Sequence, residues 1–310
     1  MPGASSTVAP RRPRRGGGPT PYVLVAPAVV LLVLFLLVPI GYTVWLSLRA
    51  SRVTGGGLGL RVEQFVGLEN YVGVLTDDGY LQGVLRMLGY GAIVVPTMLG
   101  LALLFALLLD TPRIRFGAAS RIGIFLPYAV PGVIASLLWG FLYLPNVSPI
   151  RDAVTAVGLP APDFLAPGSV LFSVANIGVW GGVGFNMIVL YTALRGIPRE
   201  MYDAARIDGA SEVQIALRVK IPLIAPALVM TGVFSIIATL QVFSEPATLQ
   251  PLTDAIPSSW VPLMTIYRDA FVNNDIHTAA AASVVLALGT LVVSLGVLSF
   301  LQKRAFGRGQ

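Results

Sequence analysis

The side chains that most often carry chemistry are scarce in this chain. Its 310 residues include no cysteine, one histidine (His277) and two lysines (Lys220 and Lys303). Without cysteine there is no thiol nucleophile, no cysteine-ligated zinc or iron–sulfur site and no disulfide. A multi-histidine metal site is also excluded. Neither lysine lies in a G-x-x-x-x-G-K-[ST] loop, so the chain has no P-loop to bind a nucleotide.

Polar and aromatic side chains inside long apolar stretches form a second group with chemical potential. Within a membrane span such polar groups are costly unless they are paired or used. They are candidate ligand-binding residues: Asn176, Trp180, Gly182, Phe185, Asn186, Ser235, Thr239, Gln241 and Glu245. Ser235 and Thr239 share a helix face. The structural alternative is that Ser and Thr bond to their own helix backbone, that Trp180 packs, and that glycines 178, 181, 182 and 184 permit close helix packing.

The elements that must position these residues are membrane helices. Hydrophobic residues make up 55% of the chain and charged residues 12%, and the mean hydropathy is +0.79. An ordinary soluble domain carries about 25% charged residues, so a soluble enzyme is excluded. Six charge-free runs are each long enough to cross a bilayer. They predict an all-α protein with spans at about 22–47, 84–109, 122–144, 169–194, 222–244 and 279–301.

The distribution of Lys and Arg predicts the orientation. Fifteen of the 21 lie in the N-terminal tail, the second-to-third loop, the fourth-to-fifth loop and the C-terminal tail, five lie on the other side, and Arg86 lies at the outer edge of the second span. By the positive-inside rule both termini are cytoplasmic. The domains expected are a disordered basic tail at 1–20, a membrane domain at 21–305 and a tail at 306–310. A cleaved signal peptide is disfavoured, because the first apolar run is too long and lacks an A-x-A site.

Two loops on the predicted outer side, and four prolines inside spans, carry weaker signals. The loop at 49–83 is long enough for a short amphipathic helix near 68–76. Five prolines predict that the loop at 145–168 is short and stiff. Prolines 39, 96, 127 and 131 lie inside spans, where each is expected to kink its helix.

The fourth-to-fifth loop, residues 195–221, carries the most local structure. Pro198 suits the first turn of a helix that should end at Gly209. Ser211 and Gln214 have the spacing of a capping box that starts a second helix. Small alanines lie near the corner, and Val213 and Leu217 form a small apolar face. Two short helices meeting at a glycine suit either docking into a partner's groove or a plain structured loop.

A resemblance favours docking. The pattern D-A-A-x₃-G-x₁₁-I-P, from Asp203 to Pro222, resembles the EAA loop of ABC importer permease subunits, with Asp203 in place of the usual Glu. The stretch F-L-P-Y-A-V-P-G-V-I-A-S-L-L-W at 125–139 is similar to the carbohydrate-uptake branch of that family. The resemblance implies an ABC type I importer permease fold, in which the loop seats in a cleft of a cytoplasmic ATPase. It implies these coupling residues: Glu200, Asp203, Ala204, Ala205, Asp208, Gly209, Ala210, Ile221 and Pro222.

The same resemblance implies the function and the partners. The chain would be a non-catalytic subunit of the cell membrane that imports a sugar, with an oligosaccharide favoured over a monosaccharide or glycerol phosphate. Its partners would be a second homologous permease (a heterodimer is expected), two ATPase subunits that bind ATP and Mg²⁺, and an extracellular solute-binding lipoprotein. No cofactor and no nucleic acid would bind this chain. Alignment with a maltose permease subunit brings Gly182, Phe185, Ser235 and Thr239 onto its sugar-contacting positions.

Two other functions are weighed against this one. An ion-coupled secondary transporter usually needs acidic or histidine side chains at bilayer depth. The charge-free runs contain none, and Asp110 and Glu245 lie at their edges. An intramembrane enzyme would need paired Asp, Ser–His or His–metal groups inside the spans, and these are missing. The import function is therefore preferred, with the secondary transporter as the alternative.

Overall fold

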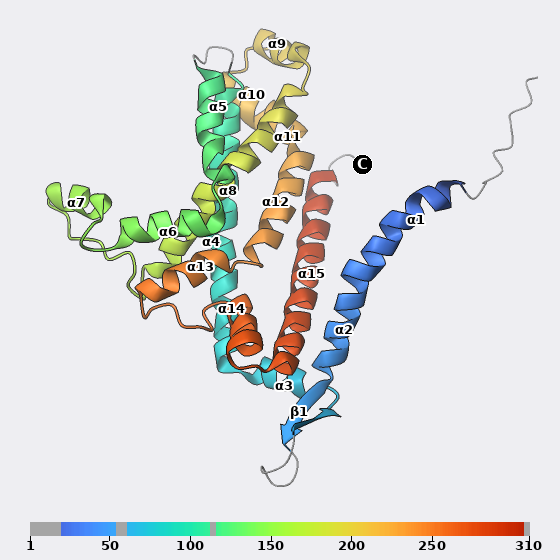
Figure 1. The fold of residues 1–310 in the computed structure, drawn as a ribbon. Coiled ribbons are helices and arrows are strands. Elements are labelled where there is room, and N and C mark those ends of the chain that lie inside the picture. Colours follow the sequence, from blue (N-terminus) through green and yellow to red (C-terminus); the bar gives the residue numbers. More distant parts are fainter. Residues whose placement is uncertain (1–19, 54–60, 112–115, 307–310) are drawn as a thin grey trace, which may run out of the picture. The chain divides into compact units, whose positions relative to one another are not determined.

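The computed structural model describes residues 20–53, 61–111 and 116–306 (Figure 1). The tails predicted at 1–20 and 306–310 lie almost wholly outside these residues. The chain divides into two compact units, Met1–Trp45 and Leu46–Gln310, and each is described by itself.

The first unit is one long apolar stretch of helix. It consists of α1 (Thr20–Leu32), a π-helical turn at Val33–Leu37 and most of α2 (Val38–Ser47). The π turn ends two residues before Pro39, which lacks the N–H that a regular helix would use there. Apolar side chains are exposed all along the stretch, as at Leu24 and Phe35. Residues Tyr22–Ser47 are long and apolar enough to span a membrane.

The second unit is mostly helical, with one small hairpin. Its helices and strands are β1 (Arg49–Val53), β2 (Arg61–Phe65), α3 (Glu69–Thr76), α4 (Asp78–Leu109), α5 (Gly117–Phe125), η2 (Leu126–Ala129), α6 (Gly132–Tyr143), α7 (Pro149–Ala156), α8 (Val170–Arg195), α9 (Arg199–Ile207), α10 (Glu212–Ile215), η3 (Ala216–Lys220), α11 (Ile221–Leu223), α12 (Ala225–Thr239), α13 (Ser244–Leu249), η4 (Gln250–Leu252), α14 (Pro262–Tyr267), η5 (Arg268–Val272) and α15 (Ile276–Phe306). The all-helical class is confirmed. The antiparallel β1–β2 hairpin is an addition that the sequence did not predict.

Helices α4 and α8 form the spine of this unit. Their buried residues meet in two clusters, one with Tyr90 and Val94 against Ile177, the other with Ala106 against Leu194. Residue numbers rise together along the contact, so the two helices run in the same direction. α4 stays continuous through Pro96 and begins at the N-cap Asp77, whose carboxylate accepts a 2.6 Å hydrogen bond from the Tyr80 amide. This spine is the rigid element that the candidate site uses.

Two of the predicted spans are bent. The helix at Gly117–Ala129 meets α6 at 96°, and the helix at Glu212–Leu223 meets α12 at 69°. The predicted spans 122–144 and 222–244 therefore fall on broken helices. Pro131 and Pro226 lie at the starts of the second halves, where their missing N–H groups cost nothing. Among the described residues, four helices are long enough to span a membrane, or six spans result if each bent pair counts as one.

The end of the unit that carries β1, β2 and α3 lies opposite the end that carries α9 and α10 (Figure 1). The short helix predicted near 68–76 is confirmed as α3. The loop at 145–168 is not simply short and stiff, because α7 forms there behind the N-cap Ser148. His277 is buried and its Nδ1 lies 3.1 Å from the Leu46 carbonyl oxygen.

Candidate functional site

A cavity of about 430 Å³ opens between α4, η2, α8 and α12. This volume lies in the range of ligand pockets, about 300–1,000 Å³. Seven of the nine predicted ligand-binding residues line it: Gly182, Phe185, Asn186, Ser235, Thr239, Gln241 and Glu245. The structure thus gathers residues from two helices and from the segment after α12 around one space. Their role as a binding site stays a prediction.

The polar side chains of the cavity differ in how far their hydrogen bonds are already used. Asn186 Nδ2 donates to the Gly182 carbonyl at 2.9 Å, and Ser235 Oγ donates to Asn186 Oδ1 at 3.4 Å. Thr239 Oγ1 donates to the Ile236 carbonyl at 2.9 Å, which is the structural alternative considered for it. Gln241 is exposed. Because the hydrogen bond between Ser235 and Asn186 is long and therefore weak, both side chains keep the capacity to bond to a ligand.

An aromatic pair supplies the apolar face of the cavity. The rings of Phe185 on α8 and Tyr128 on η2 stack with centroids 4.9 Å apart and planes 23° apart. Phe185 remains 39% exposed, so part of its ring is open to a ligand. Tyr128 reaches this position because the chain breaks after Ala129, before α6 turns away. A stacked ring pair beside amides and hydroxyls can hold a polar ring by its face and its edge.

Two predicted residues lie outside the cavity lining. Asn176 Nδ2 donates to the Tyr143 hydroxyl at 3.0 Å. Trp180 packs edge-on against Trp139, with ring centroids 6.0 Å apart. Both contacts are structural, as the packing alternative for Trp180 anticipated.

Several lining residues were not predicted. α4 contributes Tyr90, Val94 and Met98, and Tyr128, Phe234 and Phe243 add aromatic surface. The apolar residues of α4 gave no signal, because they resemble any other span-forming residue. The prolines at 127 and 131 did signal a break, and that break is what presents Tyr128.

The glycines of α8 serve close packing as well as the cavity. A Cβ atom at Gly178 would meet the Tyr90 hydroxyl, and one at Gly182 would meet the Met98 sulfur. At Gly184 it would collide with the backbone of Ile124 and Phe125 on α5. The first two line the cavity and the third does not. The structure therefore shows close packing at these glycines, and a ligand-binding role for Gly182 stays a prediction.

Of the residues that the structure describes, one with a carboxyl group and none with a basic side chain line the cavity. Glu245, at the start of α13, is half-buried there. No ion-pair partner of Glu245 is found among the described residues. The described residues also contain no group of three or more His, Asp or Glu that could hold a metal ion.

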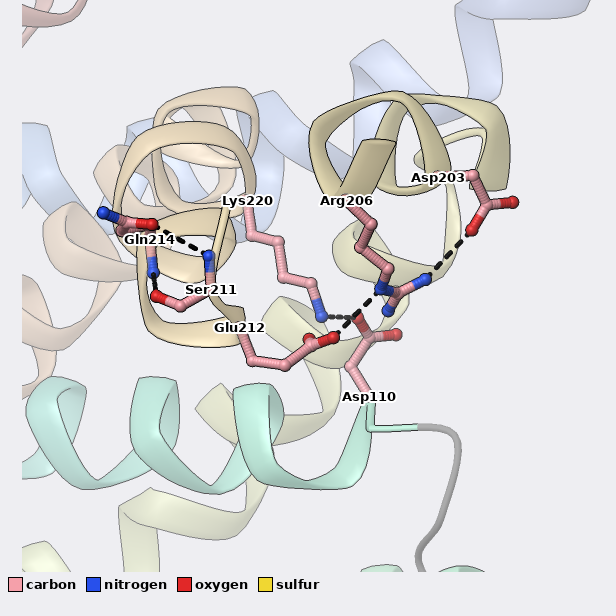
Figure 2. A network of polar contacts seen from close by, with 7 residues as sticks. All are labelled: Asp110, Asp203, Arg206, Ser211, Glu212, Gln214 and Lys220. Carbon is pink, nitrogen blue, oxygen red and sulfur yellow. Dashed lines mark hydrogen bonds and ion pairs between the residues drawn. The ribbon is translucent and has the colours of Figure 1, made fainter. Parts of the chain in front are cut away.

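The second candidate site is the loop at 195–221, called the coupling loop below. As predicted, one helix (α9) ends before Gly209, which has φ +81°, and a second (α10) begins after Ser211. The predicted capping box is confirmed (Figure 2): Gln214 N donates to Ser211 Oγ at 3.3 Å, and Ser211 N donates to Gln214 Oε1 at 2.8 Å. Glycine suits the corner because a side chain is strained at this φ.

An arginine ties the two short helices together. Arg206 Nη1 donates to Asp203 Oδ1 within α9, and its Nε donates to Glu212 Oε1 on α10, both at 3.0 Å (Figure 2). Hydrogen bonding to Glu212 raises the pKa of Arg206. The corner is thus a folded unit with a fixed surface.

That surface is largely open. Of the predicted coupling residues, Glu200, Asp203, Ala204, Asp208, Gly209 and Pro222 are exposed, while Ala205, Ala210 and Ile221 are half-buried. Apolar side chains stand out beside them, with Ile207 87% and Val213 67% exposed. Exposed apolar side chains clustered among charges are typical of a protein-docking surface.

Behind the loop, Lys220 Nζ lies 2.6 Å from Asp110 Oδ2 in a buried ion pair. The Lys220 ammonium also lies 4.8 Å from the centre of the Tyr202 ring. Burial raises the pKa of Tyr202, the charge of Asp110 raises it further, and Arg195 lowers it. The phenol is therefore protonated at neutral pH.

The chain is similar to known transport proteins along most of its length. Residues 73–309 match the family model described as binding-protein-dependent transport system inner membrane component. The sn-glycerol-3-phosphate transport system permease protein UgpA of Salmonella typhimurium is 33% identical over 284 residues, 90% of this chain and 92% of that protein. The protein of the same name from Escherichia coli O157:H7 is 31% identical over 284 residues, which again cover 90% of this chain and 92% of that protein.

Solved structures share the fold. A bacterial ABC transporter involved in the import of the acidic polysaccharide alginate contains a chain that superposes with a TM-score of 0.77. That chain is 21% identical, and the match covers 92% of this chain and 95% of that one. A chain of the MetNI methionine ABC transporter superposes with a TM-score of 0.53 at 15% identity, and the match covers 76% of this chain and 97% of that one. The chain belongs to the family of binding-protein-dependent transport system inner membrane components, with the fold of an ABC type I importer permease.

Proposed function

We propose that this permease passes an uncharged sugar, with an oligosaccharide favoured, through a pore whose opening is driven by ATP hydrolysis in separate subunits. The observation that carries the proposal is the composition of the cavity. Stacked aromatic rings lie beside amide and hydroxyl groups, and the spine helices hold them in place. Sugars are bound by such combinations of stacking and hydrogen bonds in largely preformed sites.

Charge argues for an uncharged substrate. The relatives UgpA are named for glycerol-3-phosphate and the structural neighbour for an acidic polysaccharide, both anions. Among the described residues of this chain that line the cavity, the one acidic side chain is Glu245 and none is basic. A lining without a basic side chain offers a phosphate or a uronate no ion pair, and a carboxyl group can hydrogen-bond to the hydroxyl groups of a neutral sugar. The cavity therefore supports a neutral polyhydroxy compound over an anionic one.

The coupling loop supports the remaining parts of the assembly. Its exposed α9–α10 corner suits a cleft in each of two ATPase subunits, with one loop from this chain and one from a second homologous permease. ATP and Mg²⁺ would be held by the ATPases, and this chain would supply no catalytic residue and no cofactor site. A solute-binding lipoprotein would deliver the sugar at the opposite end.

The test is reconstitution with the proteins encoded beside this gene. The complex is placed in liposomes, and ATP hydrolysis and sugar uptake are measured with the binding protein loaded from a panel of neutral and anionic sugars. We expect a neutral sugar to stimulate both. The variant Gly209→Pro should hydrolyse ATP without uptake, because proline cannot adopt φ +81°. Arg218→Met, an exposed change in the same loop, serves as the matched control.

Two results would count against the proposal. Uptake driven by an ion gradient without ATP would establish the alternative, a secondary transporter. Stimulation by anionic sugars alone would keep the importer and overturn the substrate class. In that second case Glu245→Gln should make no difference to uptake of the anion, since the carboxylate would not face the substrate.

A further inference from the structure

The buried ion pair between Lys220 and Asp110 lies where the coupling loop returns to the membrane helices. The two side chains are 7% and 4% exposed, and Nζ and Oδ2 are 2.6 Å apart. Asp110 caps the C-terminal end of α4, and Lys220 is the last residue of η3, two before Pro222. Charged side chains are rarely hidden from water to this degree unless they are paired. Asp110 lies outside the EAA pattern and Lys220 occupies a position that the pattern leaves unspecified, so the pair is a separate feature of this chain.

A third residue closes the contact from the other arm of the loop. The Tyr202 ring on α9 lies 4.8 Å from the Lys220 ammonium, within the range of a cation–π interaction. The Tyr202 hydroxyl donates to the Leu194 carbonyl, in the last turn of α8, at 3.3 Å. One small cluster therefore connects both arms of the coupling loop to the ends of the two spine helices.

The cluster lies at the C-terminal end of α4, and the same helix lines the cavity farther along its length. Tyr90, Val94 and Met98 of α4 line the cavity, and Tyr90 lies about 30 Å along the helix from Asp110. The helix between them is continuous. A displacement of the loop that keeps the ion pair closed must therefore displace the end of α4, and packed helices move as units.

We propose that the Lys220–Asp110 pair, with Tyr202 against the ammonium, is a positioning joint that makes the coupling loop and α4 move together. The inference rests on the proposed function, because the movement is imposed by the partner ATPases. Without the joint the loop is still docked and still moved, and the motion is lost in the chain at 216–224 instead of reaching the cavity. The joint is distinct from the exposed α9–α10 corner that contacts the partner.

The experiment uses the reconstituted complex and reports sugar molecules imported per ATP hydrolysed. Lys220→Met keeps an unbranched side chain one atom shorter and removes the charge. We expect the complex to assemble and to hydrolyse ATP within threefold of wild type, while import per ATP falls at least tenfold. Asp110→Asn should do the same. Arg218→Met removes an exposed cation two residues away and should leave the ratio unchanged.

The reversed pair separates a joint from a simple need for either residue. Asp110→Lys combined with Lys220→Asp restores opposite charges, and we expect it to recover at least a third of the wild-type ratio. A wild-type ratio in Lys220→Met overturns the proposal. A reversed pair as impaired as the single variants overturns it as well.

Two further measurements decide the matter if the first variants fail. Should Lys220→Met not assemble, Tyr202→Leu and Tyr202→Phe are compared. The joint requires import per ATP to fall in Tyr202→Leu, which loses the ring, and to stay at the wild-type value in Tyr202→Phe, which keeps it. Should the wild-type complex show no ATP-driven uptake, the proposed function fails and trypsin cleavage of the isolated permease judges the joint. Cleavage after Arg206 should be several-fold faster in Lys220→Met, and an unchanged rate overturns the joint.

Discussion

The aromatic pair of Phe185 and Tyr128 shows how one residue depends on a distant break in the chain. Phe185 is on the continuous helix α8, but the ring that stacks on it, that of Tyr128, comes from η2. η2 can approach because Gly184, beside Phe185, presents only hydrogen to the backbone of Ile124 and Phe125. The shape of the cavity at this point is therefore set by a glycine that does not line it.

Truncation of Phe185 should weaken substrate handling without unfolding the protein, since its ring is 39% exposed. For Phe185→Ala we expect the KM for uptake to rise about tenfold, which corresponds to roughly 1.4 kcal/mol. Phe185→Tyr keeps the ring and should stay near wild type. Phe172→Ala removes a ring of the same helix that is 60% exposed and outside the cavity lining, and should leave KM unchanged. Equal effects at both positions would place the substrate elsewhere.

Gly184 should be intolerant of any side chain. Gly184→Val forces α5 away from α8, and overpacking of this kind costs roughly 1–3 kcal/mol. The Tm of the detergent-solubilised permease should fall by several degrees. The matched control is Gly181→Val on the same helix, where a Cβ atom meets nothing within 4 Å. A similar fall in both variants would show that helix glycines, and not the contact with α5, set the stability.

At the scale of elements, local signals in the sequence predicted what local interactions determine. Pro198, Gly209 and the Ser211–Gln214 box defined α9 and α10 to within about a residue, because caps act over one turn. The contribution of α4 to the cavity and the 96° bend depend on tertiary packing, which leaves no periodic pattern. The hairpin was missed for another reason: β1 and β2 are both mostly exposed, so no alternation of burial marks them.

The capping box predicts the local stability of the second coupling helix. Ser211→Ala removes the acceptor for the Gln214 amide and should cost about 1 kcal/mol. Hydrogen exchange of residues 212–216 in the isolated permease should then be roughly fivefold faster. Ser211→Asp retains an acceptor at the cap and should preserve protection. If Ser211→Ala exchanges at the wild-type rate, the packing of buried Ile215 holds the helix and the cap is redundant.

At the scale of the whole molecule, the two ends of the second unit differ in the elements and the charges that they carry. One end carries the coupling loop with five of the chain's basic residues, and the opposite end carries the β1–β2 hairpin and α3 (Figure 1). The Lys and Arg distribution predicts that the first of these ends faces the cytoplasm. ATP-driven import requires this orientation, because the ATPases can reach the coupling loop only from inside. Topology and mechanism can therefore be tested together.

The absence of cysteine from the natural sequence makes this topology test clean, since every thiol is an introduced one. Ile207 on α9 is 87% exposed and Phe65 on β2 is 73% exposed, so a cysteine at either place is open to reagent. In intact spheroplasts a membrane-impermeant maleimide should label Phe65→Cys at once and Ile207→Cys only after permeabilisation. The unmodified protein, which should not react in either condition, is the control. The reverse pattern would place the coupling loop outside, where no ATPase could drive it, and would remove the basis of the import function.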